Sequence, residues 1–92
     1  MRLTKEQLSL YAEKFKALAH PVRLEILMEI TEGCYDLKKI MKRFNLSQPA
    51  VSQHIGKMRR LGILSSYKDG SKMCYEIINE EIKKILKLLK RR

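Results

Sequence analysis

Apolar residues at helical spacing predict two helices at the start of the chain. Thr4 and Gln7 form a capping box, and the helix that follows is expected over about residues 5–18. Its apolar face consists of Leu8, Tyr11, Phe15 and Leu18. Pro21 suits the first position of a second helix, where its missing N–H costs nothing, and Gly33 either ends that helix or begins the turn beyond it. The predicted buried stripe of the second helix is Val22, Ile26, Leu27 and Ile30.

The next two apolar stripes predict a pair of helices joined by a tight turn. The first helix is expected over about residues 35–44, with an apolar stripe of Leu37, Ile40, Met41 and Phe44. Asn45 tolerates the left-handed conformation that ends a helix, and Ser47 is a good N-cap for a helix over about residues 48–61. The core face of that helix is predicted to be Val51, Ile55, Met58 and Leu61. The segment therefore reads as a helix-turn-helix.

From Ile63 the apolar period changes to about two, which is typical of strands. The pair Asp69-Gly70 separates strand-like runs at 63–68 and 71–78, and this arrangement is a strong hairpin signal. Asn79 then caps a last helix whose apolar residues are Ile82, Ile85, Leu86 and Leu89. The predicted fold class is mostly α with a small β-hairpin, in the order of four helices, two strands and a final helix.

Composition narrows the kind of partner that the chain can have. The 92 residues, 45% of them hydrophobic, suit one domain over residues 1–92, and oligomerisation would add stability to so short a chain. Lys and Arg number 20 against 10 Asp and Glu, a net charge of +10. Between Lys38 and Lys72 nine basic residues accompany one acid, Asp69. This excess favours a polyanionic partner, although charge alone is equally compatible with a solvated basic surface.

Several classes of protein are excluded by what the sequence lacks. No apolar run approaches the roughly 20 residues that span a bilayer, and the start does not resemble a signal peptide, so we expect a cytoplasmic protein without a membrane partner. Cys34 and Cys74 form no CxxC pair and are expected to be reduced thiols. Phosphate-binding glycine loops, clustered carboxylates and a nucleophile with a base are all missing, so neither an enzyme nor a cofactor is expected.

Three segments together carry a family resemblance. KALAHPVRLEIL at Lys16–Leu27, LSQPAVSQHI at Leu46–Ile55 and GSKMCY at Gly70–Tyr75 resemble, in this order, motifs of the ArsR-type (arsenical-repressor-like) winged helix-turn-helix family. The likeness covers nearly the whole chain. It implies a homodimeric transcription regulator that binds operator DNA and releases it on a signal. Most members of this family are repressors, and the operator is expected to be pseudo-palindromic. The hairpin, at about 63–78, would be the wing.

The helix after the turn is expected to read DNA. A helix fits the major groove of B-DNA, and the N-terminal part of a recognition helix meets base edges. Gln48, Ser52 and Gln53 are therefore the predicted base-reading residues, because Gln can bond to adenine N6 and N7 together. Ser47 would cap the helix and can also touch a phosphate. His54 has two readings of equal weight, a donor to phosphate or a partly buried ring packed against the turn.

Basic side chains are expected to hold the DNA backbone. Lys57, Arg59 and Arg60 lie on the predicted recognition helix, and Lys68 and Lys72 flank the tip of the hairpin. The hairpin would touch the adjacent minor groove or its phosphates. Such contacts position a protein on DNA without specifying sequence.

The resemblance also implies that the first and last helices, at 5–18 and 80–90, pair across a two-fold axis. The residues predicted at this dimer interface are Leu8, Tyr11, Ile82, Ile85, Leu86 and Leu89. The alternative is that both helices fold back onto the core of their own chain.

No metal site is expected, and the sequence does not identify the signal to which the regulator responds. Metal-sensing members carry two cysteines one residue apart, whereas Gly33 and Tyr35 occupy those positions here and the last helix has no histidine. Cys34 and Cys74 are expected to be small buried hydrophobes, with a thiol switch using either as an alternative. A winged helix that binds protein or RNA is another alternative. The sequence determines neither effector nor operator, nor whether the regulator represses or activates.

Overall fold

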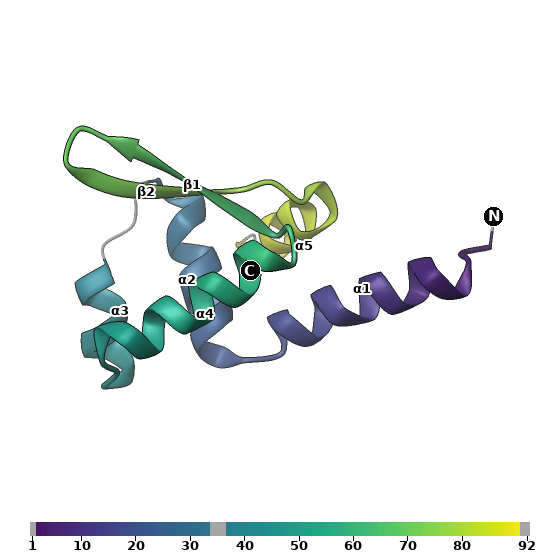
Figure 1. Ribbon diagram of the computed structural model, residues 1–92, viewed down its shortest axis with the longest axis horizontal. Coiled ribbons are helices and arrows are strands. Elements are labelled where there is room, and N and C mark those ends of the chain that lie inside the picture. The colour runs from purple at the N-terminus through teal and green to yellow at the C-terminus, as the bar shows by residue number, and fades with distance from the viewer. Residues whose placement is uncertain (1, 34–36, 91–92) are drawn as a thin grey trace.

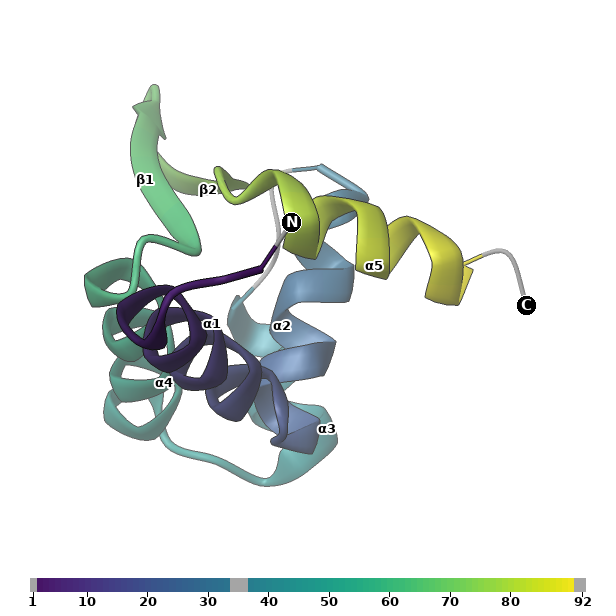
Figure 2. The same cartoon turned by 90° about the vertical axis from the view of Figure 1, so that its right-hand side faces the viewer.

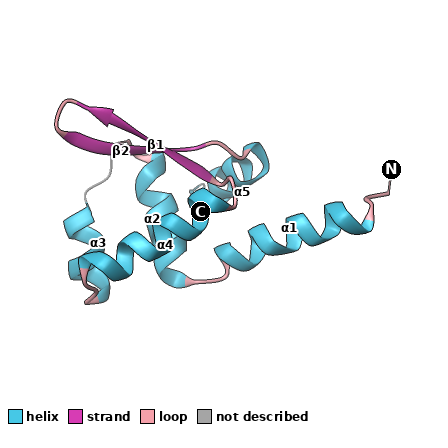
Figure 3. Cartoon of the chain, in the orientation of Figure 1, coloured by secondary structure: helices cyan, strands magenta, loops and turns pink. Residues whose placement is uncertain are grey.

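The structure is a computed structural model that describes residues 2–33 and 37–90. Within these ranges the chain forms five helices and one antiparallel hairpin (Figure 1), and Figure 3 separates helices from strands by colour. The elements in chain order are α1 (Lys5–Leu18), α2 (Pro21–Thr31), α3 (Leu37–Phe44), α4 (Gln48–Arg60), β1 (Leu64–Asp69), β2 (Lys72–Ile77) and α5 (Glu80–Lys90). The predicted fold class and element order are confirmed, while residues 35–36 of the expected third helix lie outside the described residues.

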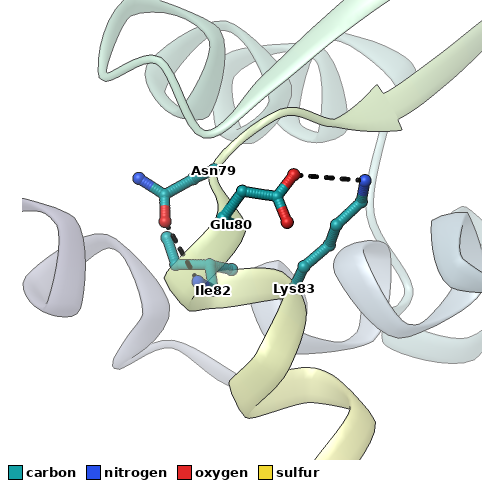
Figure 4. A network of polar contacts seen from close by, with 4 residues as sticks. All are labelled: Asn79, Glu80, Ile82 and Lys83. Atoms are coloured by element: carbon teal, nitrogen blue, oxygen red, sulfur yellow. Dashed lines mark hydrogen bonds and ion pairs between the residues drawn. The ribbon is translucent and has the colours of Figure 1, made fainter.

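Side-chain caps begin the first and last helices where the sequence predicts them. The Thr4 backbone N–H donates to Gln7 Oε1 at 2.8 Å, and the Gln7 backbone N–H donates to Thr4 Oγ1 at 3.1 Å. Asn79 Oδ1 accepts from the Ile82 backbone N–H at 3.0 Å (Figure 4). These bonds satisfy backbone donors that a helix start leaves without partners.

The core is assembled from the inner faces of α2 to α5, the last turn of α1 and the base of the hairpin. All buried side chains in the described part of the chain are apolar. The largest of the fully buried ones are Ile26, Leu27, Ile40, Met58, Ile63, Leu64, Ile82 and Leu86. The stripe predicted for α2 is buried in this core. Of the stripe predicted for α4, Val51, Ile55 and Met58 are buried, whereas Leu61 is the C-cap and is only partly buried. The opposite faces of both helices are left for solvent or ligand.

The hairpin turns one residue later than the sequence suggests. The strand register runs from Leu64 opposite Ile77 to Asp69 opposite Lys72, so the two-residue loop is Gly70-Ser71 and not Asp69-Gly70. Gly70 has a φ of 67°, which glycine adopts at no steric cost. Asp69 remains in the ladder because the glycine can take the first loop position itself.

The helix α1 projects from the rest of the molecule. Figure 1 shows it extending away from the other helices, and the longest dimension of the chain is 44 Å against 27 and 26 Å for the other two. Within α1, only Ala17 and Leu18 are buried, at its last turn. Leu8, Leu10 and Phe15 are 53%, 63% and 48% exposed. An apolar helix face this exposed is unusual in a monomer.

Candidate nucleic-acid interface

The turn between α3 and α4 sets the direction of α4. Asn45 has a φ of 53°, and the Leu46 N–H donates to the Met41 carbonyl at 2.9 Å, as in a Schellman motif. Ser47 Oγ then accepts from the Ala50 backbone N–H at 3.3 Å and caps α4. The roles predicted for Asn45 and Ser47 within the fold are therefore confirmed.

The C-terminal end of α4 forms the same kind of motif as the end of α3. Gly62 has a φ of 73°, and the Ile63 N–H donates to the Met58 carbonyl at 2.9 Å. Ile63 and Met58 are both fully buried, which supplies the apolar contact that often accompanies this motif. The Ser47 side chain caps the start of α4, backbone bonds close its end, and its inner face is packed, so α4 holds its outer side chains in place.

The predicted base-reading side chains lie together on the outer face of α4. Gln48 is the first residue of the helix, and Ser52 and Gln53 follow about one turn later. All three residues are exposed, and within the described part of the chain their side chains form no hydrogen bond. Their donors and acceptors are therefore available to an outside ligand.

His54 packs against the start of α2. Arg23 Nε donates to His54 Nδ1 at 3.1 Å, and the His54 and His20 ring centroids are 4.6 Å apart. Burial, followed by the Coulombic effects of His20 and Arg23, lowers the pKa of His54 below its ordinary value of 6.5. Of the two readings of His54, the structure shows the partly buried ring, which packs against His20 and Arg23 at the start of α2. A phosphate contact through Nε2 stays a prediction.

Arg23 and His20 are the residues of this region that the sequence interpretation missed. Arg23 Nη1 also donates to the Ala17 carbonyl at 3.4 Å, so one side chain links the end of α1 to α4. His20 caps α2, because its Nδ1 accepts from the Val22 backbone N–H at 3.2 Å. Both residues stand in the AHPVR segment, where the sequence pattern predicts roles for Pro21 and Val22 but none for His20 or Arg23.

We expect acid to weaken the fold through His54. The unfolded side chain takes up its proton near pH 6.5, whereas the folded one has a lower pKa, so the unfolded state binds more protons between these two values. The His54 contribution is then complete above pH 6.5 and is lost as the pH falls through the folded pKa. Urea unfolding of the protein and of His54→Gln between pH 5 and 8 checks this. The difference in unfolding free energy between them should shrink with acid; a constant difference would contradict the expectation.

The basic residues predicted for the DNA backbone are on the same side as α4. Lys57, Arg59 and Arg60 are exposed on its second half, and Lys68 and Lys72 are exposed beside the hairpin tip. Figure 2 shows α4 and the hairpin on one side of the molecule and α5 on the other. The hairpin thus adds exposed basic residues on the side of the molecule where α4 lies.

The structure corrects part of the predicted dimer interface. Ile82 and Leu86 are 1% and 0% exposed because they pack into the core of their own chain, so they are not available to a second protomer. Leu8 and Leu89 are exposed and Ile85 is half-buried, so these three remain candidates. The alternative of helices folded back onto their own core thus holds for one face of α5 and for the last turn of α1.

Tyr11, another residue predicted at the dimer interface, is influenced by Glu81 of α5 in its own protomer. A hydrogen bond to Glu81, followed by the negative charge of that carboxylate, raises the pKa of Tyr11 above 10.0. The Tyr11 ring stacks on Phe15, with centroids 6.5 Å apart. Part of Tyr11 is therefore used inside the chain, and its place at a dimer interface stays a prediction.

Cys74 is buried in β2 but is not a free thiol. It is 1% exposed, as expected for a small buried hydrophobe, and it is disulfide-bonded. The expectation of a reduced thiol is therefore wrong for Cys74, while Cys34 lies outside the described residues. Across residues 2–33 and 37–90, no cluster of three or more His, Cys, Asp or Glu side chains is placed to hold a metal ion. Over the same ranges no helix combines the length and apolarity needed to cross a membrane.

A helix presented by a tight helix-turn-helix and flanked by a basic hairpin defines a winged helix-turn-helix domain. The sequence profile of the family described as "Bacterial regulatory protein, arsR family" matches residues 20–66. The chain belongs to this ArsR family of bacterial regulatory proteins, as the resemblance predicted. It is accordingly a DNA-binding transcription regulator and not an enzyme.

Similar proteins agree with this assignment. An uncharacterised HTH-type transcriptional regulator of Methanocaldococcus jannaschii is 35% identical over 79 residues, which cover 85% of this chain and 89% of the relative. The transcriptional repressor PagR of Bacillus anthracis is 37% identical over 79 residues, covering 85% and 79% of the two chains. The solved structure of reduced HlyU from Vibrio cholerae superposes with a TM-score of 0.79 at 29% identity, covering 95% of this chain and 92% of that one.

Proposed function

We propose that the protein is a homodimeric repressor that works in the cytoplasm and reads a pseudo-palindromic operator with α4. The observation that carries this proposal is the exposed set of Gln48, Ser52 and Gln53, unbonded within the described chain and held on a helix fixed at both ends. Repression is favoured by relatives: PagR and two biofilm growth-associated proteins are named repressors, whereas HlyU is named a transcriptional activator.

The proposed contacts divide into reading and positioning. Gln48, Ser52 and Gln53 would read base edges in the major groove. Ser47 and His54 would add phosphate contacts beside them, His54 through its Nε2. The basic residues that would grip the backbone are Lys57, Arg60, Lys68 and Lys72.

The salt dependence of binding tests the proposal. With about six phosphates contacted per dimer, the affinity should fall with salt at a log–log slope of about −5. Fluorescence anisotropy of a labelled duplex at several salt concentrations measures this slope. Lys68→Ala should make it shallower, whereas Lys84→Ala, an exposed residue of α5 on the other side of the molecule, should leave it unchanged. A slope near zero would reject DNA as the partner and would favour the protein-binding alternative.

Dimerisation is proposed through the projecting part of α1 together with the exposed apolar residues of α5. Leu8 and Leu10 contribute little to the core of their own chain, and Leu88 and Leu89 are 62% and 45% exposed. Covering these side chains with a second copy would remove apolar surface from water at both helices, and each Å² would contribute roughly 25 cal/mol.

We expect Leu8→Lys to convert the dimer to a monomer. A lysine placed in an apolar interface loses its hydration without gaining a partner, so the dimer dissociation constant should rise at least about tenfold. Sedimentation at about 10 μM, a concentration at which specific dimers of micromolar affinity persist, measures the change. Ser9→Lys adds the same charge to an adjacent exposed position and should remain dimeric. If both variants stay dimeric, the interface lies elsewhere.

A redox-responsive regulator is a second candidate, favoured by the disulfide-bonded state of Cys74 in the wing strand β2. Reduction would release a covalent restraint on the hairpin that is proposed to contact DNA. One relative, HlyU from Vibrio cholerae, has a solved structure of its reduced form, which supports considering redox state for this chain as well. The test compares DNA affinity of oxidised and reduced protein, with Cys74→Ser and Cys34→Ser as variants. Equal affinities in the two states would reject this candidate.

A further inference from the structure

A cavity of about 340 Å³ lies between the end of α2, the hairpin and α5. Its lining is drawn from these three regions, and among the described residues none of the lining belongs to α4. Its volume is at the lower end of the range of about 300–1,000 Å³ that holds small organic ligands. The cavity is therefore separate from the proposed base-reading surface, and we call it the lysine pocket.

One wall of the lysine pocket is basic. Lys83, Lys87 and Lys90 line it from α5, and their spacing of four and three residues places them on one face of the helix. Lys90 Nζ lies 2.8 Å from Glu32, and Lys83 Nζ lies 3.7 Å from Glu80 (Figure 4). In the described part of the chain Lys87 has no ion pair, so its ammonium group is the one left for a ligand.

The other walls are apolar or aromatic. Ile30 and Ile77 line the pocket with buried side chains, and Tyr67 and Tyr75 line it from the hairpin. Glu76 is the one acid among the described lining residues; it is exposed, so water and salt screen its charge. The pocket thus combines an unpaired cation with surfaces suited to a flat apolar body.

We propose that the lysine pocket binds a small aromatic carboxylate. Lys87 takes the carboxylate, and the ring lies against the isoleucines and tyrosines of the other walls. A monoanion matches the pocket better than a phosphate dianion does, because Lys83 and Lys90 are already paired with carboxylates and Lys87 supplies one charge. None of the proposed base-reading residues takes part, so failure of this inference would leave the proposed function intact.

Calorimetric titration of the full chain with cinnamate, and with its neutral analogue cinnamamide, tests the proposal. The charged hydrogen bond to a partly exposed lysine should make cinnamate bind about tenfold more tightly than cinnamamide. Lys87→Met should remove that difference while leaving cinnamamide binding unchanged. Lys84→Met, an exposed lysine of the same helix outside the pocket lining, should bind both compounds as the wild type does.

Three outcomes would overturn the proposal. The first is that none of cinnamate, benzoate and indole-3-acetate shows saturable binding up to about 10 mM. Binding weaker than this would be too weak to count as specific recognition. The second is equal binding of cinnamate and cinnamamide. The third is unchanged cinnamate binding in Lys87→Met, with that variant shown by circular dichroism to be folded.

Discussion

Replacing Gln53 by alanine should cost about 1–3 kcal/mol of binding free energy per half-site on the preferred DNA sequence and almost nothing on random DNA. Gln53 is exposed on the outer face of α4, and within the described residues its amide is unbonded. A bidentate contact to a base edge would depend on that amide, whereas attraction to phosphates would not. Anisotropy titrations with the selected operator and with a scrambled duplex separate the contribution of the base contact from that of the attraction to phosphates.

Lys68→Ala is the matched control for this prediction. Lys68 lies beside the hairpin tip and is proposed to contact backbone, so its removal should weaken binding to both duplexes by a similar factor. Equal effects of the two substitutions on the ratio of specific to random affinity would show that the division between reading and positioning residues is wrong.

Replacing Ile26 by alanine should lower the free energy of unfolding by about 2–5 kcal/mol. Ile26 is fully buried in α2, and its side chain contributes to the centre of the core. The loss combines apolar surface returned to water with a cavity that the surrounding helices only partly fill. Since domains of this kind are stable by only about 5–15 kcal/mol, the variant should be close to unfolding at physiological temperature.

Urea unfolding at fixed protein concentration measures this loss, because the stability of a dimer depends on concentration. Ile26→Val removes one methyl group from the same site and should cost only about 0.5–1.5 kcal/mol. A loss for Ile26→Ala no larger than that for Ile26→Val would mean that Ile26 does not pack as described.

The helix-turn-helix could be predicted from the sequence because its signals are local. Asn45 ends α3 because it tolerates a positive φ, and Ser47 caps α4 by bonding only to the backbone of the next turn. Gly62 works in the same way at the other end of α4. Each of these residues determines its conformation within a few positions, so the order and approximate limits of the helices follow directly.

The roles of residues on α5 and in the AHPVR segment depend on contacts distant in sequence. Ile82, Ile85, Leu86 and Leu89 form one continuous apolar face in the sequence, and only the packed fold shows that Ile82 and Leu86 belong to the core. The contact between Arg23 and His54 spans 31 positions, and no helical periodicity indicates it. The disulfide-bonded state of Cys74 could not be predicted for a similar reason, because the spacing of cysteines in the sequence does not give the distance between them in the fold.

Selection of bound duplexes from a random pool tests most directly whether α4 reads DNA. The expected result is enrichment of two inverted half-sites spaced about one helical turn, 10–10.5 base pairs, or a multiple of it apart, with adenines at the positions contacted by glutamine. The same selection with Gln53→Ala should retain the half-site spacing and lose preference at one position in each half. A wild-type pool that stays unenriched after repeated rounds would contradict the account.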